Sequence, residues 1–200
     1  ATALVDVTNS RLQRLILNTR EVRLQPGESM GLKVTGVFAD GTRQELPSAR
    51  VRFTSTNTSV VLVSGPGSLL GVAPGTAAIV VTADELTAAA SVTVGTPADV
   101  GGVEFFPRSY SLAPNGDTRQ FLVRRQLPDG SVVNVSSARD GTLYFVSDPA
   151  VATITPDGLL TTRAAGEVEV TTIHAGRSAV ALLSVSAPSV GPTVVGGAGG

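Results

Sequence analysis

Apolar and polar residues alternate along this 200-residue chain in short runs with a period of two. Examples are "GLKVTGVFADG" (31–41) and "GEVEVTTI" (166–173), which are rich in Val and Thr and bounded by turn residues. A period of two puts successive side chains on opposite faces of a strand. No stretch places apolar residues at helical spacing over three turns. The pattern therefore predicts an all-β protein.

The same series of runs occurs twice along the chain. The aligned segments are 15–27 with 103–115, 31–41 with 120–130, and 53–63 with 144–154. The pairs Asp40-Gly41 and Asp129-Gly130 hold matching places, as do Gly75 and Gly166. Asp-Gly between alternating runs predicts a hairpin, because glycine adopts positive φ without steric cost. The repeat predicts two copies of one module.

Each copy is expected to bury one apolar face of alternating residues. In the first copy these are Met30, Leu32, Val34 and Phe38, with Gly36 as a gap. In the second copy they are Phe121, Val123 and Leu127, with Arg125 in the place of Gly36. A single sheet cannot bury its apolar face alone, whereas two packed sheets can. About seven short strands in about 90 residues are typical of an immunoglobulin-like β-sandwich.

Five segments follow from these observations, as predictions of the domain organisation. They are an N-terminal arm (1–14), a first Ig-like domain (15–95), a linker (96–102), a second Ig-like domain (103–187) and a Gly-rich tail (188–200). The fold class predicted is thus all-β, with two tandem Ig-like sandwiches.

The motifs and their order resemble those of bacterial immunoglobulin-like domains of group 2. In the first copy they are "QPGES", "VFADGTRQEL", "TSTNTSVVLV" and "GSLLGVAPGTAAIVVTA"; in the second they are "LPDGSVVNV", "VSDPAVATI" and "GLLTTRAAGEVEVTTI". The resemblance covers residues 15–94 and 103–187. It implies an exported, surface-attached or virion protein in which the module is a spacer, an adhesive element or an ornament. The family has no shared catalytic or ligand residues, so none is carried over.

Composition narrows the function classes further. Net charge is −1 and the fifteen cations are scattered, which argues against nucleic acid and anionic membrane as partners. There is no Cys, and no apolar run is long enough to insert into a membrane. With His174 as the single histidine, triads and His-based zinc sites lack their ligands. We expect no catalytic residue, no cofactor and no metal.

For several polar residues we favour a structural role over a catalytic or metal-binding one. His174 is expected at the surface near a strand end, and Glu167 and Glu169 are expected to face water. A glycosidase would need a cleft around that carboxylate pair. Loop aspartates of the second copy suit calcium, but local hydrogen bonding in turns explains them equally well.

Three aromatic residues of the second copy are candidate ligand contacts, namely Phe106, Tyr110 and Tyr144. An outward-facing ring can serve as a platform for a sugar or as a protein contact. The alternative is that such a ring packs under a loop or at a domain junction.

The N-terminal segment is a candidate assembly arm, with Ala3, Val5, Val7 and Leu12 as its apolar residues. Three fates are open: the arm extends its own sheet, hangs as a tether, or adds to a sheet edge of a neighbouring subunit. The start "ATALVDV" lacks Met, which suggests a processed form or a piece of a longer protein.

The leading hypothesis is a non-enzymatic structural module at the cell surface, in the extracellular space or on a virion. It would act as a spacer, a fibre subunit or a surface ornament. Its partners would be protein subunits of the same or a neighbouring assembly, including a homo-oligomer formed by strand addition. The alternative is an adhesive module that binds a surface glycan or protein through loops of the second domain.

Overall fold

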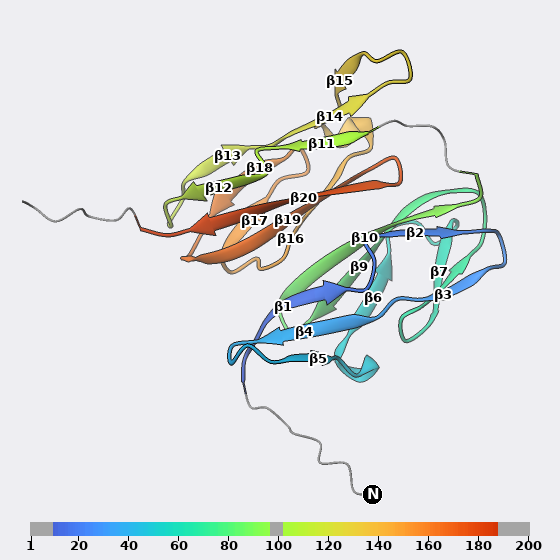
Figure 1. Cartoon of the computed structure of the whole chain (residues 1–200), viewed down its shortest axis with the longest axis horizontal. Helices are drawn as coiled ribbons and strands as arrows, with labels where there is room; N and C mark the ends of the chain where they lie inside the picture. Colours follow the sequence, from blue (N-terminus) through green and yellow to red (C-terminus); the bar gives the residue numbers. More distant parts are fainter. Residues whose placement is uncertain (1–9, 97–101, 188–200) are drawn as a thin grey trace, which may run out of the picture.

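A computed structural model describes residues 10–96 and 102–187, which form two sandwiches of strands (Figure 1). The first contains β1 (Leu12–Leu17), β2 (Glu21–Leu24), β3 (Ser29–Gly31), β4 (Val34–Phe38), β5 (Arg43–Glu45), the 3₁₀ turn η1 (Ser48–Arg50), β6 (Arg52–Ser55), β7 (Val61–Gly65), β8 (Ser68–Gly71), β9 (Gly75–Ala83) and β10 (Leu86–Val94). These strands make three sheets, ordered β1-β4-β5, β2-β10-β9-β6 and β3-β8-β7.

The second sandwich contains the same elements in the same order. They are β11 (Val103–Phe106), β12 (Ser109–Leu112), β13 (Thr118–Gln120), β14 (Leu122–Gln126), β15 (Val132–Asn134), η2 (Ala138–Asp140), β16 (Leu143–Val146), β17 (Ala152–Ile154), β18 (Leu159–Thr162), β19 (Gly166–His174) and β20 (Arg177–Val185). Their sheets are ordered β11-β14-β15, β12-β20-β19-β16 and β13-β18-β17.

Strand for strand, the second set of sheets repeats the first. In both, a long antiparallel hairpin (β9–β10 or β19–β20) is flanked by one parallel strand, β2 or β12. The Asp-Gly hairpins lie where the repeat predicted them, with φ of 81° at Gly41 and 83° at Gly130. The prediction of two tandem Ig-like β-sandwiches is therefore confirmed.

Each sandwich has its own hydrophobic core, built from the predicted inward faces. In the first, Val34 and Phe38 are buried, and the space beside Gly36 is filled by Leu12 and Leu46. A Cβ at Gly36 would lie 2.6 Å from Leu12 Cδ1, so the gap in the alternation is the place where Leu12 packs. In the second, a stacked pair of rings, Phe105 and Phe121 with centroids 4.7 Å apart, occupies the centre.

Leu12 corrects the predicted boundary of the N-terminal arm. It is the first residue of β1, pairs with Phe38 of β4 and is only 5% exposed. The strand thus begins inside the segment 1–14. Ala3, Val5 and Val7 lie outside the described residues.

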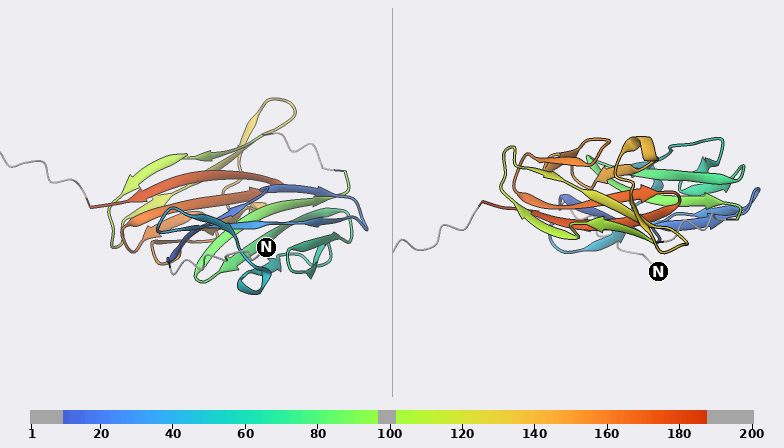
Figure 2. Two further views of the ribbon diagram at one scale, coloured as in Figure 1. Left: turned by 60° about the horizontal axis from the view of Figure 1, so that its bottom comes forward. Right: turned by 90° about the horizontal axis from the view of Figure 1, so that it is seen from above.

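The two sandwiches lie side by side, with one outer sheet face against another (Figures 1 and 2). The sheet β2-β10-β9-β6 of the first faces the sheet β12-β20-β19-β16 of the second, with β10 lying against β16, β19 and the start of β20. This face-to-face packing positions the candidate site.

Candidate functional site

The contact between the sandwiches begins with small side chains on the outward face of β9 and β10. Ala78 and Ala89 are both 0% exposed, although they point away from the core of their own sandwich. They form a cluster with Ile173 of β19, against which Phe145 of β16 packs. Small residues on one side allow close approach of the larger side chains on the other, so the interface is packed like a core.

Polar contacts surround this apolar centre. Arg20 Nη1 lies 2.6 Å from Glu169 Oε1, and the two side chains are 33% and 14% exposed. Glu21 accepts a hydrogen bond from the Ser178 amide at 2.9 Å and lies 3.7 Å from Arg177. These are charge-assisted contacts, which are stronger than neutral ones where water is partly excluded.

One main-chain hydrogen bond also crosses the interface. The amide of Thr87, at the start of β10, donates to the carbonyl of Ser147 at 2.9 Å. Because a main-chain bond needs the two backbones at a fixed separation, it defines the distance between the sandwiches at this end.

Glu169 corrects a prediction made from the alternation. We expected Glu167 and Glu169 to face water together, but only Glu167 is exposed. Glu169 points at the neighbouring sandwich and is paired with Arg20. The two carboxylates therefore do not form a matched pair in solvent.

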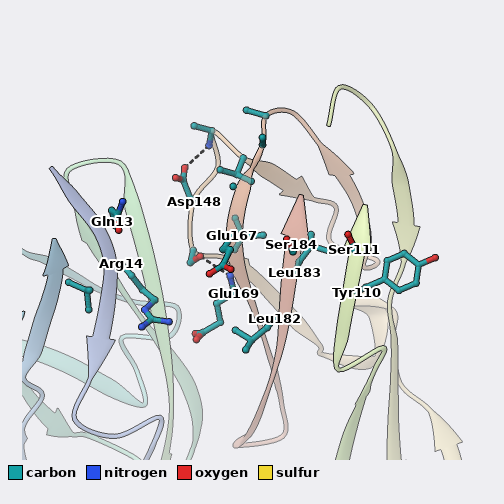
Figure 3. A pocket seen from close by; sticks show the side chains of 18 of the residues that line it. Gln13, Arg14, Tyr110, Ser111, Asp148, Glu167, Glu169, Leu182, Leu183 and Ser184 are labelled. Carbon is teal, nitrogen blue, oxygen red and sulfur yellow. Dashed lines mark hydrogen bonds between the residues drawn. The ribbon is translucent and has the colours of Figure 1, made fainter. Parts of the chain in front are cut away.

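Beyond the interface the sandwiches diverge and leave a groove of about 1020 Å³ (Figure 3). One wall is β1 with Gln13 and Arg14, and the other is the outer face of β19 and β20, which carries Glu167 and Leu182. Leu182 is 58% exposed. The groove combines cationic, anionic, hydroxyl and apolar side chains, which suits an extended polar ligand more than a small apolar one.

The loop aspartates of the second sandwich are held by local hydrogen bonds. Asp129 accepts from the amide and hydroxyl of Ser131, at 2.9 and 2.6 Å, and these bonds lower the pKa of its carboxyl. Asp157 accepts from Ser137 and from the Ala138 amide at the start of η2. Within residues 10–96 and 102–187, no group of three or more His, Asp or Glu side chains is arranged to hold a metal ion.

The three candidate aromatic residues lie in different surroundings. Tyr110 is 38% exposed, with the guanidinium of Arg119 4.3 Å from its ring centre, and Phe106 is 37% exposed near Arg124. Both rings are thus covered in part by an arginine.

Tyr144, in contrast, belongs to the core of the second sandwich. Its ring lies 6.2 Å from that of Phe105, and its hydroxyl donates to the Ser136 carbonyl at 2.8 Å. Burial raises the pKa of Tyr144 to about 12. The structure therefore does not place Tyr144 on a ligand-binding surface.

His174 is buried and not, as predicted, at the surface. It is 4% exposed, and its Nδ1 lies 2.9 Å from the hydroxyl of Thr142, which itself donates to the Val135 carbonyl. That hydroxyl proton is therefore committed, so Nδ1 is the protonated nitrogen. Burial, together with the charge of Arg125, lowers the pKa of His174 and favours the neutral ring.

The interface was missed by the sequence reasoning, although one signal could have found it. The strand "LTAAASVTV" is buried on both faces, from Ala88 to Val94. Uninterrupted burial with small residues on the outward face is typical of a strand covered on both sides.

Comparison with known proteins supports the assignment of the fold. Residues 13–94 match the family model of the bacterial Ig-like domain (group 2). The chain is 28% identical over 160 residues to ice-binding protein 1 of Shewanella frigidimarina, and the aligned region covers 80% of this chain and 17% of that protein. This chain thus spans only a small part of the relative's length.

Solved structures resemble this chain more distantly. Domains 5-6 of the S-layer protein SbsC align over 90% of this chain and 100% of that one, with 16% identity and a TM-score of 0.38. SbsC domains 4 and 5 align over 89% of this chain and 98% of that one, with 21% identity and a TM-score of 0.37. Human protocadherin-24 EC1-2 aligns over 88% and 99%, with 11% identity and a TM-score of 0.29.

No helix in the described part of the chain is long and apolar enough to cross a membrane. The strand order, the positions of the hairpins and the family match agree for the first sandwich. Residues 13–94, which form the first sandwich, thus match the bacterial Ig-like domain of group 2.

Proposed function

We propose that this chain is a non-enzymatic structural module of a longer protein that acts outside the cell. Two Ig-like domains form one rigid body that holds neighbouring parts of the protein at a fixed distance. The observation that carries this proposal is the interface, in which Ala78 and Ala89 are fully buried between the sandwiches and Arg20 is paired with Glu169. Domains joined only by a flexible linker would need no such packing.

The comparisons support the part of the proposal that concerns the longer protein. The aligned relative is named as an ice-binding protein, and this chain matches 17% of it. A pair of domains of this kind would then be one segment of such an extracellular protein. The second sandwich, which repeats the strand order of the first, would be a diverged member of the same family.

The ion pair of Glu169 with Arg20 supports a non-enzymatic role. In a glycosidase both carboxylates must face the substrate and one must exchange a proton. Glu169 Oε1 lies 2.6 Å from Arg20 Nη1, so this oxygen already contacts a cation of the neighbouring sandwich.

Distance measurements between two introduced labels would test the rigid body. The chain has no Cys, so Leu62→Cys and Leu159→Cys, both at exposed sites, give two unique positions for nitroxide labels. A rigid pair of domains gives one narrow distance distribution. A broad distribution, unchanged when Ala89→Arg is added to disrupt the interface, would refute the proposal.

An adhesive function is the second candidate, and the groove favours it. Its exposed Leu182 and its mixed charges could bind an extended glycan or peptide without any change in the domain interface. Binding to a glycan or peptide array that is lost in Leu182→Asp, but kept in Leu122→Asp on the opposite sheet, would establish this function. A fibre or virion role would in addition require contacts between copies.

A further inference from the structure

The strand β15 lies at the end of the sheet β11-β14-β15, on the side of the second sandwich away from the domain interface (Figure 1). Within the described part of the chain, no strand pairs with its outer side. An edge of this kind presents free main-chain N–H and C=O groups.

Two hydrogen bonds show which residues of β15 carry these free groups. The Leu127 amide donates to the Ser131 carbonyl at 2.8 Å, and the Val135 amide donates to the Val123 carbonyl at 2.9 Å. In an antiparallel pair, alternate residues direct their polar groups to the same side. Residues 131, 133 and 135 therefore face β14, while Val132 and Asn134 direct their N–H and C=O groups outward.

The side chains along this edge are uncharged, and two of the three in β15 are valines. Val132 is 56% exposed and Val133 is 37% exposed, and no charged residue occurs from Ser131 to Val135. The nearest carboxylate along the chain, Asp129, is held inside the hairpin by Ser131. Proteins commonly protect such edges with charges, because an apolar edge recruits other strands.

The first sandwich provides an internal comparison. Its equivalent edge strand, β5, has the sequence Arg43-Gln44-Glu45, all of it exposed, and Glu45 lies 3.3 Å from Lys33. Pairing of β5 with another strand would remove water from these charges, whereas pairing of β15 would cover valines. The two copies thus share a strand order but differ in whether this edge is protected.

We propose that β15 pairs with β15 of a second copy of this chain, antiparallel and around a two-fold axis at Val133. In this register Val132 exchanges both main-chain hydrogen bonds with Asn134 of the second copy, and the two-fold axis repeats the exchange. Val133 then stands opposite itself in a non-hydrogen-bonded pair. The two sheets merge into one of six strands, ordered β11-β14-β15 and then the same three in reverse.

A second copy is the occupant because the edge is complementary to itself. Its free donors and acceptors match under two-fold rotation, the paired segments contain no charged residue, and an apolar residue lies on the axis. Two-fold dimers with the same patch on both subunits are the commonest assemblies of identical chains. The interface would be small, so we expect a weak and concentration-dependent dimer.

Single cysteines test the register directly, since the chain has no other Cys. In the proposed dimer the Cα atoms of the two Val133 residues are about 4.5 Å apart, within the range of a disulfide, whereas the two Val132 residues are too far apart. Under mild oxidation Val133→Cys should give a disulfide-linked dimer at least tenfold faster than Val132→Cys. Gln44→Cys, at the equivalent place on β5, should behave like Val132→Cys.

The outcome of this experiment is decisive in either direction. Preferential cross-linking at Val133 supports the two-fold pairing. Equal rates for the three variants, or the fastest rate for the more exposed Val132→Cys, would show random collision and overturn it.

Association without any cross-link gives an independent measurement. Light scattering from about 5 to about 500 µM, the range for weak contacts, should show a mass rising above 20.3 kDa. Val133→Lys, which would place like charges opposite each other on the axis, should stay at 20.3 kDa. A monomer at every concentration of the unmodified chain would refute the proposal. It would leave the spacer function untouched, because that function depends on β10, β16 and β19.

Discussion

Ala89→Arg should separate the two sandwiches without unfolding either of them. Ala89 lies on the outward face of β10 and is 0% exposed only because the second sandwich covers it. An arginine there would be buried against Ile173, and the interface carboxylates Glu169 and Glu21 are already paired with Arg20 and Arg177. Burial of an unpaired charge costs several kcal/mol, and about 4 kcal/mol would lower the ratio of closed to open molecules about a thousandfold.

The size of the effect on shape can be worked from the fold. Each sandwich of about 90 residues has a radius of gyration of about 12 Å. With sheets about 10 Å apart, face-to-face sandwiches have centres about 20 Å apart and a combined radius of gyration of about 16 Å. A nine-residue strand is about 30 Å long, so sandwiches linked end to end would have centres about 40 Å apart and a radius of about 23 Å.

Small-angle X-ray scattering measures this difference directly. We expect the unmodified chain to be compact and Ala89→Arg to increase the radius of gyration by several ångströms, with the β-sheet circular dichroism unchanged. The matched control is Leu182→Arg. Leu182 lies on the outward face of β20, at the place that Ser91 has beside Ala89 on the outward face of β10. Leu182 is 58% exposed, whereas Ser91 is 0% exposed, so an arginine at position 182 would remain in solvent. An equal radius for all three proteins would refute the role that we assign to the interface.

Three further predictions concern single residues. Gly75→Ala should destabilise the first sandwich by about 1–3 kcal/mol in urea unfolding, because its Cβ would lie 2.8 Å from Val60 Cγ2 at φ 153°; Gly31→Ala, with open space around it, is the control. Glu169→Gln should cost about 1 kcal/mol of unfolding free energy and reduce its dependence on NaCl, since the partly exposed ion pair is lost. The pKa of His174 is lowered in the folded state, so the free energy of unfolding should have its full value above about pH 6.5 and should fall as the pH drops below that value. His174→Gln should remove this fall between about pH 6.5 and about pH 5. An unchanged slope of the free energy against pH in this variant would contradict the assignment.

Local signals made most of the fold predictable. The Asp-Gly hairpins and the period-two runs depend on residues close in sequence, and the duplication gave each of them a second occurrence. The start of β1 was not predictable in this way. Leu12 belongs to the strand because it fills the space beside Gly36, and that contact joins residues far apart along the chain.

The candidate site was less predictable because it depends on how the sandwiches meet. Alternation correctly put Glu169 on the outward face of its strand, but it could not show that Arg20 lies across from that face. For His174 the error had another cause. Its surroundings are polar, with Thr142 beside it and Arg125 nearby in the place that Gly36 has in the first copy, so a buried histidine is accommodated there.

The contact between the sandwiches also gives the pair a direction. Ala78 of the first sandwich corresponds to Glu169 of the second, and Thr54 of the first corresponds to Phe145 of the second. After duplication the first copy carries the smaller side chains on its interface face, and the second copy carries the larger ones that pack against them. If the order of the two sandwiches along the chain were exchanged, the face with small side chains would follow the face with large ones. The two sandwiches therefore have different interface faces, and neither can replace the other in the pair.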